Sequence, residues 1–393
     1  MPADRAAAQP HVVSAPTLNG LSVAAAIANE SVSGPGRQLG ALAAAMRALG
    51  SDFRVIILHR SGNPEPAYAE YLDGLGVPCV MVEDRGPLDV PGVARRIARL
   101  LRDWKTDVIQ THGYKATAAG WFLRRSREHR PWIGFFHGET HENLKARFYH
   151  RLDHAMLGSA DRVVVMSLLQ HARFARMGER ARVIHNAVLP DPGSVGGDDT
   201  AAIAAAAAGL DHPILGVIGR LSPEKGVDVF LDACKHLAAA GRPFSALIAG
   251  DGPDRAALED RCRQLGLDQR VRFLGTVRRV SGLYRVLDLL VIPSRSEGLP
   301  NVLLEALGAG LPIVATRVGA VPEVLTDQAA GVVVPAGSPA ALADAVAPAL
   351  AQARSPEAHA ARAATVARFS VDQRVRTHIA LYAEVLGRGS VGV

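Results

Sequence analysis

The sequence predicts an α/β protein made of two doubly wound domains that face each other across a cleft. Three observations support this prediction. The chain has 393 residues, too many for one ordinary core and about right for two domains of roughly 180 to 200 residues. Short apolar runs alternate with amphipathic segments throughout, as in parallel sheets whose strands are joined by helices. A stretch rich in Pro, Gly and Asp lies near the middle, at residues 189–199.

Five apolar runs in the first half are predicted to be buried parallel strands. Each is short and rich in β-branched or aromatic residues, and a longer amphipathic segment separates it from the next. The runs are FRVIILH, DVIQTHG, WIGFFHG, DRVVVMS and ARVIHNA, which begin at Phe53, Asp107, Trp132, Asp161 and Ala181. We therefore expect residues 20–190 to form the first domain, with a disordered extension over residues 1–19.

The second half repeats this alternation. Its runs are PILGVIGRLS, FSALIAGDGP, VRFLGTV, DLLVIPS and PIVATRVG, which begin at Pro213, Phe244, Val271, Asp288 and Pro312. The alanine-rich run 201–209 predicts a short helix before the first of these strands, because alanine is the best helix former. We therefore expect a second domain over residues 200–368, a linker at residues 189–199, and a ligand between the two domains.

Composition and cysteine content indicate what kind of protein this is and in which cellular compartment it lies. With 48% hydrophobic and 21% charged residues, the chain is globular. Cys79, Cys234 and Cys262 are too few and too widely spaced for a disulfide framework or a zinc cluster, which indicates a reducing compartment. The first residues lack the pattern of a signal peptide, and no apolar window of about 18 residues predicts a membrane span. We expect a cytoplasmic protein whose membrane contact, if any, is peripheral and at the inner face.

The positive charge is concentrated in the first half. The net charge is +6, and residues 91–182 hold 18 basic residues against 8 acidic ones. Three interpretations remain open: a solvated helix face, a surface for anionic lipid head groups or lipid-linked phosphates, and a nucleic-acid surface. The last is disfavoured because aromatic residues are only 5% of the chain and no nucleic-acid-binding motif is present. We expect no nucleic-acid partner.

Residues 294–325 are the most informative segment. A helix that starts near Pro300 and runs to Gly310 would carry proline close to its first turn, where a missing N–H costs nothing. The free N–H groups of the next residues favour an anion such as a diphosphate above the preceding strand. These residues are Asn301, Val302 and Leu303.

Two acids in this segment, Glu297 and Glu305, are separated by seven residues. On one continuous helix they would lie about 12 Å apart, too far to share one bond. That span suits two acids that hold different ends of a long ligand, such as the sugar and the ribose of a nucleotide sugar. The alternative on spacing alone is that both are surface acids.

Together with other segments, this one closely resembles the family-four glycosyltransferases, which are retaining enzymes of GT-B architecture with two Rossmann-like domains. The segments follow the order of the family along nearly the whole chain, which makes them specific for family and fold but not for substrate. They are residues 33–50, 107–116, 135–167, 183–188, 218–233, 247–253 and 294–325.

The resemblance assigns roles to four charged residues in the second domain. Arg220 and Lys225 match the basic pair on the donor's pyrophosphate, where two cations stabilise the charge that develops on the leaving group. Without the resemblance they would be taken for solvated loop charges. Glu305 matches the acid that accepts hydrogen bonds from the ribose, and Glu297 the acid that meets the transferred sugar.

Backbone groups are implicated as well. Leu299 and Asn301 occupy the stretch whose amides approach the sugar and phosphate in the family. In the first domain, Gly34 and Gly36 lack a Cβ and would let the backbone approach a phosphate. The family turn has adjacent glycines, whereas Pro35 separates them here.

Two histidines are candidates near the sugar's reactive carbon. His137 matches the family histidine at the end of a strand, and would bind a donor hydroxyl or position the acceptor. His112, also at a strand end, is the alternative. Each could instead be a structural histidine.

The resemblance implies a transferase that uses a nucleotide-sugar donor, with UDP favoured, and a hydroxyl acceptor. The basic residues within 91–182 suggest that the acceptor is presented at a membrane, as a lipid-linked or cell-envelope glycan. No Asp-x-Asp occurs, so we expect no metal and no other cofactor. A helix within residues 369–393 is expected to cross back to the first domain, as it does in this fold. The remaining alternatives are a nucleotide-sugar epimerase, a sugar phosphorylase, or a non-catalytic binding protein with the same fold.

Overall fold

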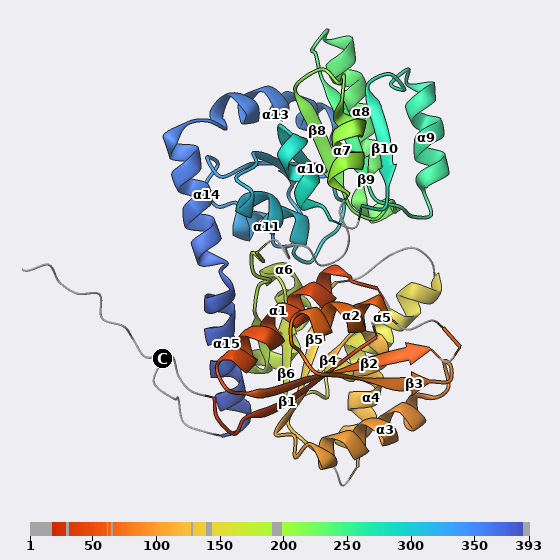
Figure 1. Ribbon diagram of the computed structural model, residues 1–393, viewed down its shortest axis with the longest axis vertical. Coiled ribbons are helices and arrows are strands. Elements are labelled where there is room, and N and C mark those ends of the chain that lie inside the picture. The colour runs from red at the N-terminus through yellow and green to blue at the C-terminus, as the bar shows by residue number, and fades with distance from the viewer. Residues whose placement is uncertain are drawn as a thin grey trace, which may run out of the picture.

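The computed structural model describes residues 18–28, 31–60, 62–63, 66–126, 129–138, 144–190, 199–277 and 279–387. Within these ranges the chain forms two α/β domains, the second stacked above the first in Figure 1. The expected extension at 1–19 and linker at 189–199 lie mostly outside the described residues. Leu18 is described and its N–H donates to the Leu49 carbonyl at 2.9 Å, so the packed chain begins before residue 20.

The first domain contains a parallel sheet of seven strands in the order β3-β2-β1-β4-β5-β6-β7. The strand order reverses between β1 and β4. Open α/β sheets bind their ligands at the carboxyl ends of the strands beside such a reversal. The strands are β1 (Ser22–Ile27), β2 (Asp52–Arg60), β3 (Cys79–Asp84), β4 (Val108–His112), β5 (Trp132–Phe136), β6 (Arg162–Val165) and β7 (Ala181–Val183). The helices are α1 (Gly34–Ala48), α2 (Ala67–Gly74), α3 (Val90–Asp103), α4 (Tyr114–Arg124), α5 (Leu144–Leu157) and α6 (Leu168–Arg173).

The second domain contains a parallel sheet of six strands in the order β10-β9-β8-β11-β12-β13. Here the order reverses between β8 and β11. The strands are β8 (Ile214–Ile218), β9 (Ser245–Ala249), β10 (Val271–Gly275), β11 (Leu289–Ile292), β12 (Ile313–Thr316) and β13 (Val332–Val334). The helices are α7 (Thr200–Ala207), α8 (Val227–Ala239), α9 (Arg255–Gln264), α10 (Ser281–Val286), α11 (Asn301–Gly308), α12 (Val321–Val324) and α13 (Pro339–Gln352).

The predicted fold class is confirmed, because both domains are doubly wound parallel sheets. All ten predicted runs contain a strand, and the alanine-rich run forms α7. Three strands were missed. β1 has the sequence SVAAAI, in which alanine gives little strand signal, and β3 is an edge strand with exposed Val80 and Met81. β13 has only three residues.

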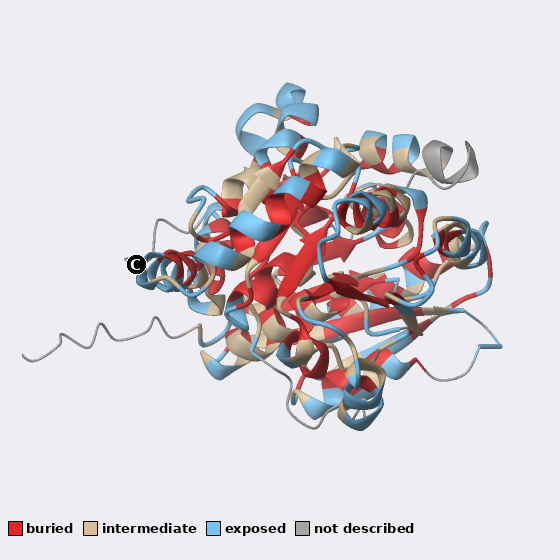
Figure 2. Ribbon diagram, turned by 90° about the horizontal axis from the view of Figure 1, so that it is seen from above, coloured by how far each residue is buried: buried red, intermediate tan, exposed pale blue. Residues whose placement is uncertain are grey.

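The cores lie on the two faces of each sheet, where the strands are buried beneath the helices (Figure 2). Strands β4 and β5 are buried along their whole length. Helix α4 lies close to β5 because Gly120 has no side chain: a Cβ there would be 2.7 Å from the Trp132 ring. The buried Trp132 indole N–H donates to Thr111 Oγ1 at 2.8 Å, which satisfies the only polar group of that side chain.

Two C-terminal helices connect the domains. Helix α14 (Pro356–Arg368) contacts α11, and α15 (Val371–Val385) contacts α1 of the first domain (Figure 1). Between them, the Phe369 carbonyl accepts a hydrogen bond from the N–H of Val188 at 2.8 Å. At the far end of α15, Glu384 binds Arg162 and Arg182 at 2.7 and 2.9 Å. No helix in the described ranges is long and apolar enough to cross a membrane.

Candidate active site

Two loops of the second domain lie together where its strand order reverses. One follows β8 and contains Arg220 and Lys225; the other follows β11 and contains Glu297. Arg295 holds them together. Its backbone N–H donates to the Glu224 carbonyl at 2.7 Å, and its guanidinium donates to the Pro223 carbonyl at 2.9 Å.

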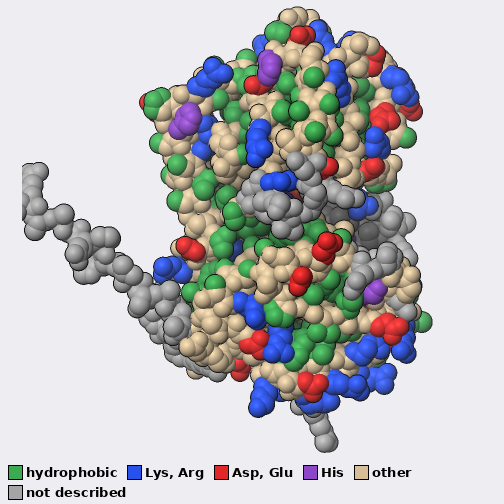
Figure 3. All heavy atoms as spheres, viewed as in Figure 1, with side chains coloured by type: hydrophobic (Ala, Val, Ile, Leu, Met, Phe, Trp, Pro, Cys, Tyr) green, Lys and Arg blue, Asp and Glu red, His purple; other side chains and the backbone are tan. Residues whose placement is uncertain are grey.

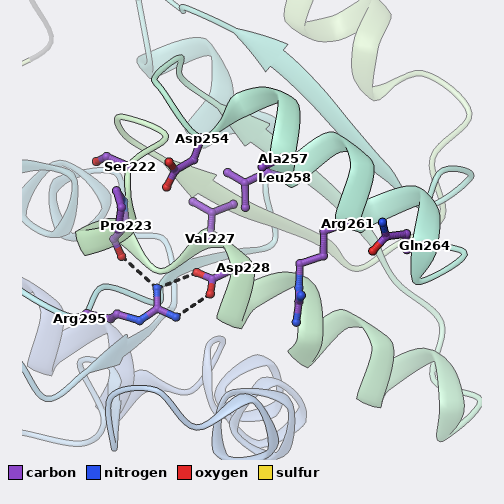
Figure 4. A pocket seen from close by; sticks show the side chains of 10 residues that line it. All are labelled: Ser222, Pro223, Val227, Asp228, Asp254, Ala257, Leu258, Arg261, Gln264 and Arg295. Carbon is purple, nitrogen blue, oxygen red and sulfur yellow. Dashed lines mark hydrogen bonds and ion pairs between the residues drawn. The ribbon is translucent and has the colours of Figure 1, made fainter. Parts of the chain in front are cut away.

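The same guanidinium binds both carboxylate oxygens of Asp228, at 2.7 and 2.6 Å (Figure 4). Burial acts to raise the pKa of Asp228, but the hydrogen bonds and charge of Arg295 lower it below its usual value. The pair lines a cavity of about 480 Å³ whose residues all come from the second domain, between Ser222 and Arg295. This cavity therefore lies within one domain and does not span the two.

The first loop turns at Gly226, which has φ of +64°. A Cβ at this position would lie 2.2 Å from the Pro293 carbonyl oxygen at the end of β11. Both the left-handed backbone and the close approach require glycine. The turn thereby holds the loop with Lys225 directly against the end of β11.

Gly226→Ala should lower the free energy of unfolding by more than the roughly 1 to 2 kcal/mol of a left-handed alanine. Gly241→Ala is a matched control, since Gly241 has φ of +66° and no atom lies within 4 Å of the position that a Cβ would take there. The difference between the two variants in urea denaturation measures the close contact with Pro293. Equal destabilisation would show that the contact is not tight.

Lys225 and Glu297 form an ion pair with an Nζ–Oε1 distance of 2.7 Å. Ser294 Oγ donates to the same carboxylate oxygen at 2.7 Å, and the Glu297 side chain is largely buried. Arg220 lies exposed in the same loop as Lys225, near the end of β8. Glu297 precedes α11 while Glu305 is on it, so the two acids do not share one helix, and the 12 Å spacing expected for a continuous helix does not apply.

Glu305 lies where the domains meet. Arg37 of the first domain binds it at 2.8 Å, and Tyr284 Oη donates to its other oxygen at 2.9 Å. Burial and the nearby Glu305 raise the pKa of Tyr284 well above its usual value, so the phenol remains a hydrogen-bond donor. The sequence predicted Glu305 as a site residue but not Arg37 or Tyr284. Arg37 lies in the matched segment 33–50, where only the glycines were singled out, and Tyr284 lies outside the matched segments.

Asn301 also connects the domains. Its Oδ1 accepts hydrogen bonds from Gln38 at 3.1 Å and Asn186 at 3.0 Å, both from the first domain. Gly34 is needed for this approach, since a Cβ there would lie 2.3 Å from Asn301 Nδ2. Gly36 is in the first turn of α1, where its N–H donates to Ser33 Oγ at 3.2 Å. The two glycines thus lie in the first turn of α1.

The first turn of α11 differs in one respect from the prediction. Leu303 N–H donates to the Pro300 carbonyl at 3.2 Å, so it is not free. The N–H groups of Asn301 and Val302 have no acceptor within the described ranges. Leu299, which precedes this turn, is buried. Two free N–H groups therefore remain at this helix end, where the helix dipole favours an anion.

The two candidate histidines lie side by side at the ends of β4 and β5. His112 Nδ1 and His137 Nε2 are 2.9 Å apart, so one ring donates a hydrogen bond and the other accepts it. Burial lowers the pKa of His112 well below its usual value and that of His137 to about 4. Both imidazoles are therefore neutral at pH 7. The His137 carbonyl also faces the Glu297 loop, since a Cβ on Gly298 would lie 2.6 Å from it.

A pH dependence of stability follows from three buried histidines, His112, His137 and His378. Burial lowers the pKa of His378 to about 3, whereas in the unfolded chain each takes up a proton near pH 6.5. Below pH 6.5 the unfolded state binds more protons, so stability is fully present above that pH and is lost as the pH falls towards 4. The slope should be about 1.4 kcal/mol per pH unit for each histidine.

Urea denaturation at a series of pH values would measure this slope. His137→Asn should reduce it by about a third, because it removes one of three protons. His236→Gln, on the exposed face of α8, should leave it unchanged. A flat profile between pH 7 and about pH 5 would contradict the neutral, buried state of these histidines.

Taken together, Arg37 and His137 of the first domain and Lys225, Glu297 and Glu305 of the second border the place where the domains meet. Two cations, two carboxylates, neutral imidazoles and free backbone N–H groups suit a ligand with both hydroxyl and phosphate groups. Among the described residues, no group of three or more His, Cys, Asp or Glu side chains is arranged to hold a metal ion.

Comparisons with known proteins agree with this arrangement. Residues 33–187 match the glycosyl transferase 4-like domain, and residues 212–352 match the glycosyl transferases group 1 domain. A phosphatidyl-myo-inositol mannosyltransferase of Mycobacterium leprae is 30% identical over 320 residues, covering 78% of this chain and 80% of the relative. The lipopolysaccharide core biosynthesis mannosyltransferase LpsB of Rhizobium meliloti is 34% identical over 193 residues, which cover 46% of this chain and only 54% of the relative.

A solved structure shows the same fold. The crystal structure of Anabaena HepE in complex with UDP-glucose matches with a TM-score of 0.75 and 21% identity, covering 93% of this chain and 99% of that one. The resemblance found in the sequence motifs is thus confirmed. The chain belongs to the group 1 glycosyltransferases, with the GT-B fold.

Proposed function

We propose that this protein is a retaining glycosyltransferase that moves a sugar from a nucleoside-diphosphate sugar, preferably a UDP-sugar, to a hydroxyl acceptor. The observation that carries this proposal is the close approach of the His137 backbone carbonyl, from the first domain, to Gly298 in the loop whose Glu297 is paired with Lys225. The carboxyl ends of both sheets' central strands contribute to this place, which is where open α/β sheets bind their ligands. HepE, whose complexes contain UDP and UDP-glucose, supports the choice of donor.

The donor would lie mainly on the second domain. Lys225 and Arg220 would bind the diphosphate, together with the free N–H groups of Asn301 and Val302. Glu297 would accept hydrogen bonds from the sugar, and Glu305 from the ribose hydroxyls. Because Lys225 and Glu297 are paired in the structure, the donor would insert between them. Lys225 would then exchange the carboxylate for a phosphate, and Glu297 would exchange the ammonium for sugar hydroxyls.

The chemistry would depend on stabilising the leaving group. As the glycosidic bond breaks, negative charge would develop on the diphosphate, and the cations and N–H groups would stabilise it without a metal ion. Attack from the same face, assisted by the leaving phosphate, would retain the configuration. The neutral His137 can donate to or accept from a hydroxyl, and would position the donor sugar or the acceptor.

The acceptor would be a lipid-linked or cell-envelope glycan bound by the first domain. Two relatives are named for lipopolysaccharide core and phosphatidyl-myo-inositol mannosyl transfer, which supports an acceptor of this class. Helix α3 offers a surface for it. Val93 and Ile97 lie on its apolar face and are buried, whereas its outer face is basic (Figure 3, lower edge).

Peripheral binding to an anionic membrane follows from this surface. Arg95, Arg99 and Arg102 are exposed on α3, and Leu88 just before it is 94% exposed. Each arginine near an anionic surface contributes about 1 kcal/mol, so replacing all three with serine should weaken vesicle binding by about 100-fold. Co-sedimentation with phosphatidylglycerol vesicles at low salt would measure this.

The matched control replaces three exposed cations of the second domain with serine, Lys235, Arg242 and Arg354, and should leave binding unchanged. Binding of the wild type should also weaken as salt is raised. Equal binding to neutral and anionic vesicles would show that the basic surface of the first domain is only a solvated face.

The proposed function is tested by turnover of UDP-glucose, UDP-galactose, UDP-N-acetylglucosamine and GDP-mannose in EDTA, with envelope lipid extract as acceptor. We expect release of the nucleoside diphosphate from one donor and a glycosylated product. Conversion of the donor to its epimer, or a product that forms only with inorganic phosphate, would point to the alternative activities. A complete loss of turnover in EDTA would contradict the metal-independent mechanism.

A further inference from the structure

A single buried amide connects three distant parts of the chain. Gln38 on α1 is 2% exposed, and its side chain uses every hydrogen-bonding position it has. Its Nε2 donates to the Ala187 carbonyl at 2.8 Å and to Asn301 Oδ1 at 3.1 Å. Its Oε1 accepts from the Ala187 N–H at 3.0 Å and from Arg374 Nη1 at 2.8 Å. We call Gln38 with these three partners the Gln38 junction.

The four hydrogen bonds fix the orientation of the Gln38 amide. A rotated amide would place its NH₂ group against the Ala187 N–H and the Arg374 guanidinium, and would leave the Ala187 carbonyl without a donor. In this orientation the NH₂ group of Gln38 faces Asn301 Oδ1 and donates to it. The same oxygen accepts a second hydrogen bond from the Asn186 side chain at 3.0 Å. The side chain at the start of α11 is thus held by two N–H groups of the first domain.

Arg374 on α15 is an unusual member of this junction. It is 6% exposed, it has no carboxylate partner within the described ranges, and its Nε lacks a hydrogen-bond partner there. Burial lowers the pKa of Arg374 to about 10. A buried cation without a counter-charge costs stability, so folding alone does not account for it. What its guanidinium does is hold Gln38, by donating at 2.8 Å to both its side-chain and main-chain oxygens.

We infer that Gln38 and Arg374 are positioning residues for the donor site. Through Asn301 they hold the first turn of α11 at one place against the first domain, so that its free N–H groups meet the diphosphate while His137 faces the sugar. This inference rests on the proposed function. If Arg374 positions the site through Gln38, the site assembles only when α15 has docked against α1. The other residues of the site lie far earlier in the sequence than α15.

The junction should affect catalysis more than nucleotide binding. The groups proposed to bind UDP are mostly in the second domain and do not need the first, whereas sugar transfer needs both domains in register. Loss of the junction should therefore lower kcat and leave the affinity for UDP nearly unchanged. A residue with a merely structural role would instead change the thermal stability and affect both constants together.

The experiment compares Gln38→Met, Arg374→Met and the double variant with wild type, using the nucleotide sugar that the wild type turns over. We expect kcat to fall by about tenfold or more in each, with the Kd for UDP from calorimetry within about threefold of wild type. Because Arg374 acts through Gln38, the double variant should be no slower than Gln38→Met alone. Arg376→Met, exposed on α15, is the control and should be unchanged.

Arg374→Met protects the test from a folding failure, since Gln38 Oε1 keeps the Ala187 N–H as a donor and Gln38 Nε2 keeps both of its acceptors. Unchanged kcat in all three variants would overturn the inference, as would additive losses of kcat or a matching loss of UDP affinity. These outcomes presuppose an active wild type. A wild type that binds no nucleoside diphosphate would instead contradict the proposed function.

Discussion

Glu297→Ala should reduce the rate of sugar transfer by about 100-fold or more while the chain stays folded. The carboxylate is held by Lys225 and Ser294 at 2.7 Å each, close to where His137 of the other domain approaches. A buried acceptor at this point orients the hydroxyls of the transferred sugar, and alanine leaves those hydroxyls unpaired. The affinity for UDP, which lacks the sugar, should change much less.

The measurement is kcat and the Kd for UDP in the wild type, in Glu297→Ala and in Glu259→Ala. Glu259 is an acid of the second domain that pairs with Arg255 on the surface of α9, so its loss should leave kcat unchanged. Circular dichroism and thermal melting confirm that each variant is folded. Near-normal turnover by Glu297→Ala would remove this residue from the active site.

Lys225→Ala should lower kcat/KM for the nucleotide sugar by about 10- to 100-fold, because the diphosphate loses a cation that stabilises its developing charge. Arg220→Ala should act in the same direction. The variant also leaves Glu297 without its ionic partner, so the effects of Lys225→Ala and Glu297→Ala should not be additive. Calorimetry should show weaker binding of UDP but unchanged binding of uridine.

Lys235→Ala is the matched control for this prediction, since Lys235 is exposed on α8 in the same domain. It changes the net charge equally and should leave both constants as in wild type. If Lys225→Ala and Lys235→Ala bind UDP equally well, Lys225 does not contact the diphosphate.

Much of the fold could be predicted from the sequence because its strands are short, apolar and bounded by turn residues. Two strands that were not predicted, β1 and β3, show which strands this pattern does not detect. Strand β1 is mostly alanine, which favours helices in isolation, and becomes a strand because β2 and β4 flank it in the sheet. Strand β3 is half exposed at the edge of its sheet, where side chains need not be apolar.

The candidate site could be predicted only where a motif marks it. Lys225 and Glu297 lie in recognisable loops, and the structure pairs them. Arg37 and Gln38 lie in the matched segment 33–50 and Tyr284 lies outside the matched segments, but none of the three was singled out. Their importance comes from partners that are distant in the sequence. Such partnerships depend on how two domains meet, which local sequence patterns do not specify.

The hydrogen-bonding role of Asn301 was missed for the same reason. The sequence pointed to its backbone at a helix N-terminus, whereas the structure adds a side chain held by Gln38 and Asn186 of the other domain. For Leu303 the sequence predicted too much. Its N–H was expected to be free, but in the tight first turn of α11 it donates a hydrogen bond to the Pro300 carbonyl.

The central claim is that a nucleoside-diphosphate sugar binds here without a metal ion. Calorimetric titration of UDP, GDP and ADP into the wild type, in EDTA and again with Mg²⁺, tests it most directly. We predict that one of the three, UDP by preference, binds in EDTA with an affinity that Mg²⁺ does not change and that Lys225→Ala weakens by about tenfold or more. Failure of all three to bind, or binding only with Mg²⁺, would contradict the account.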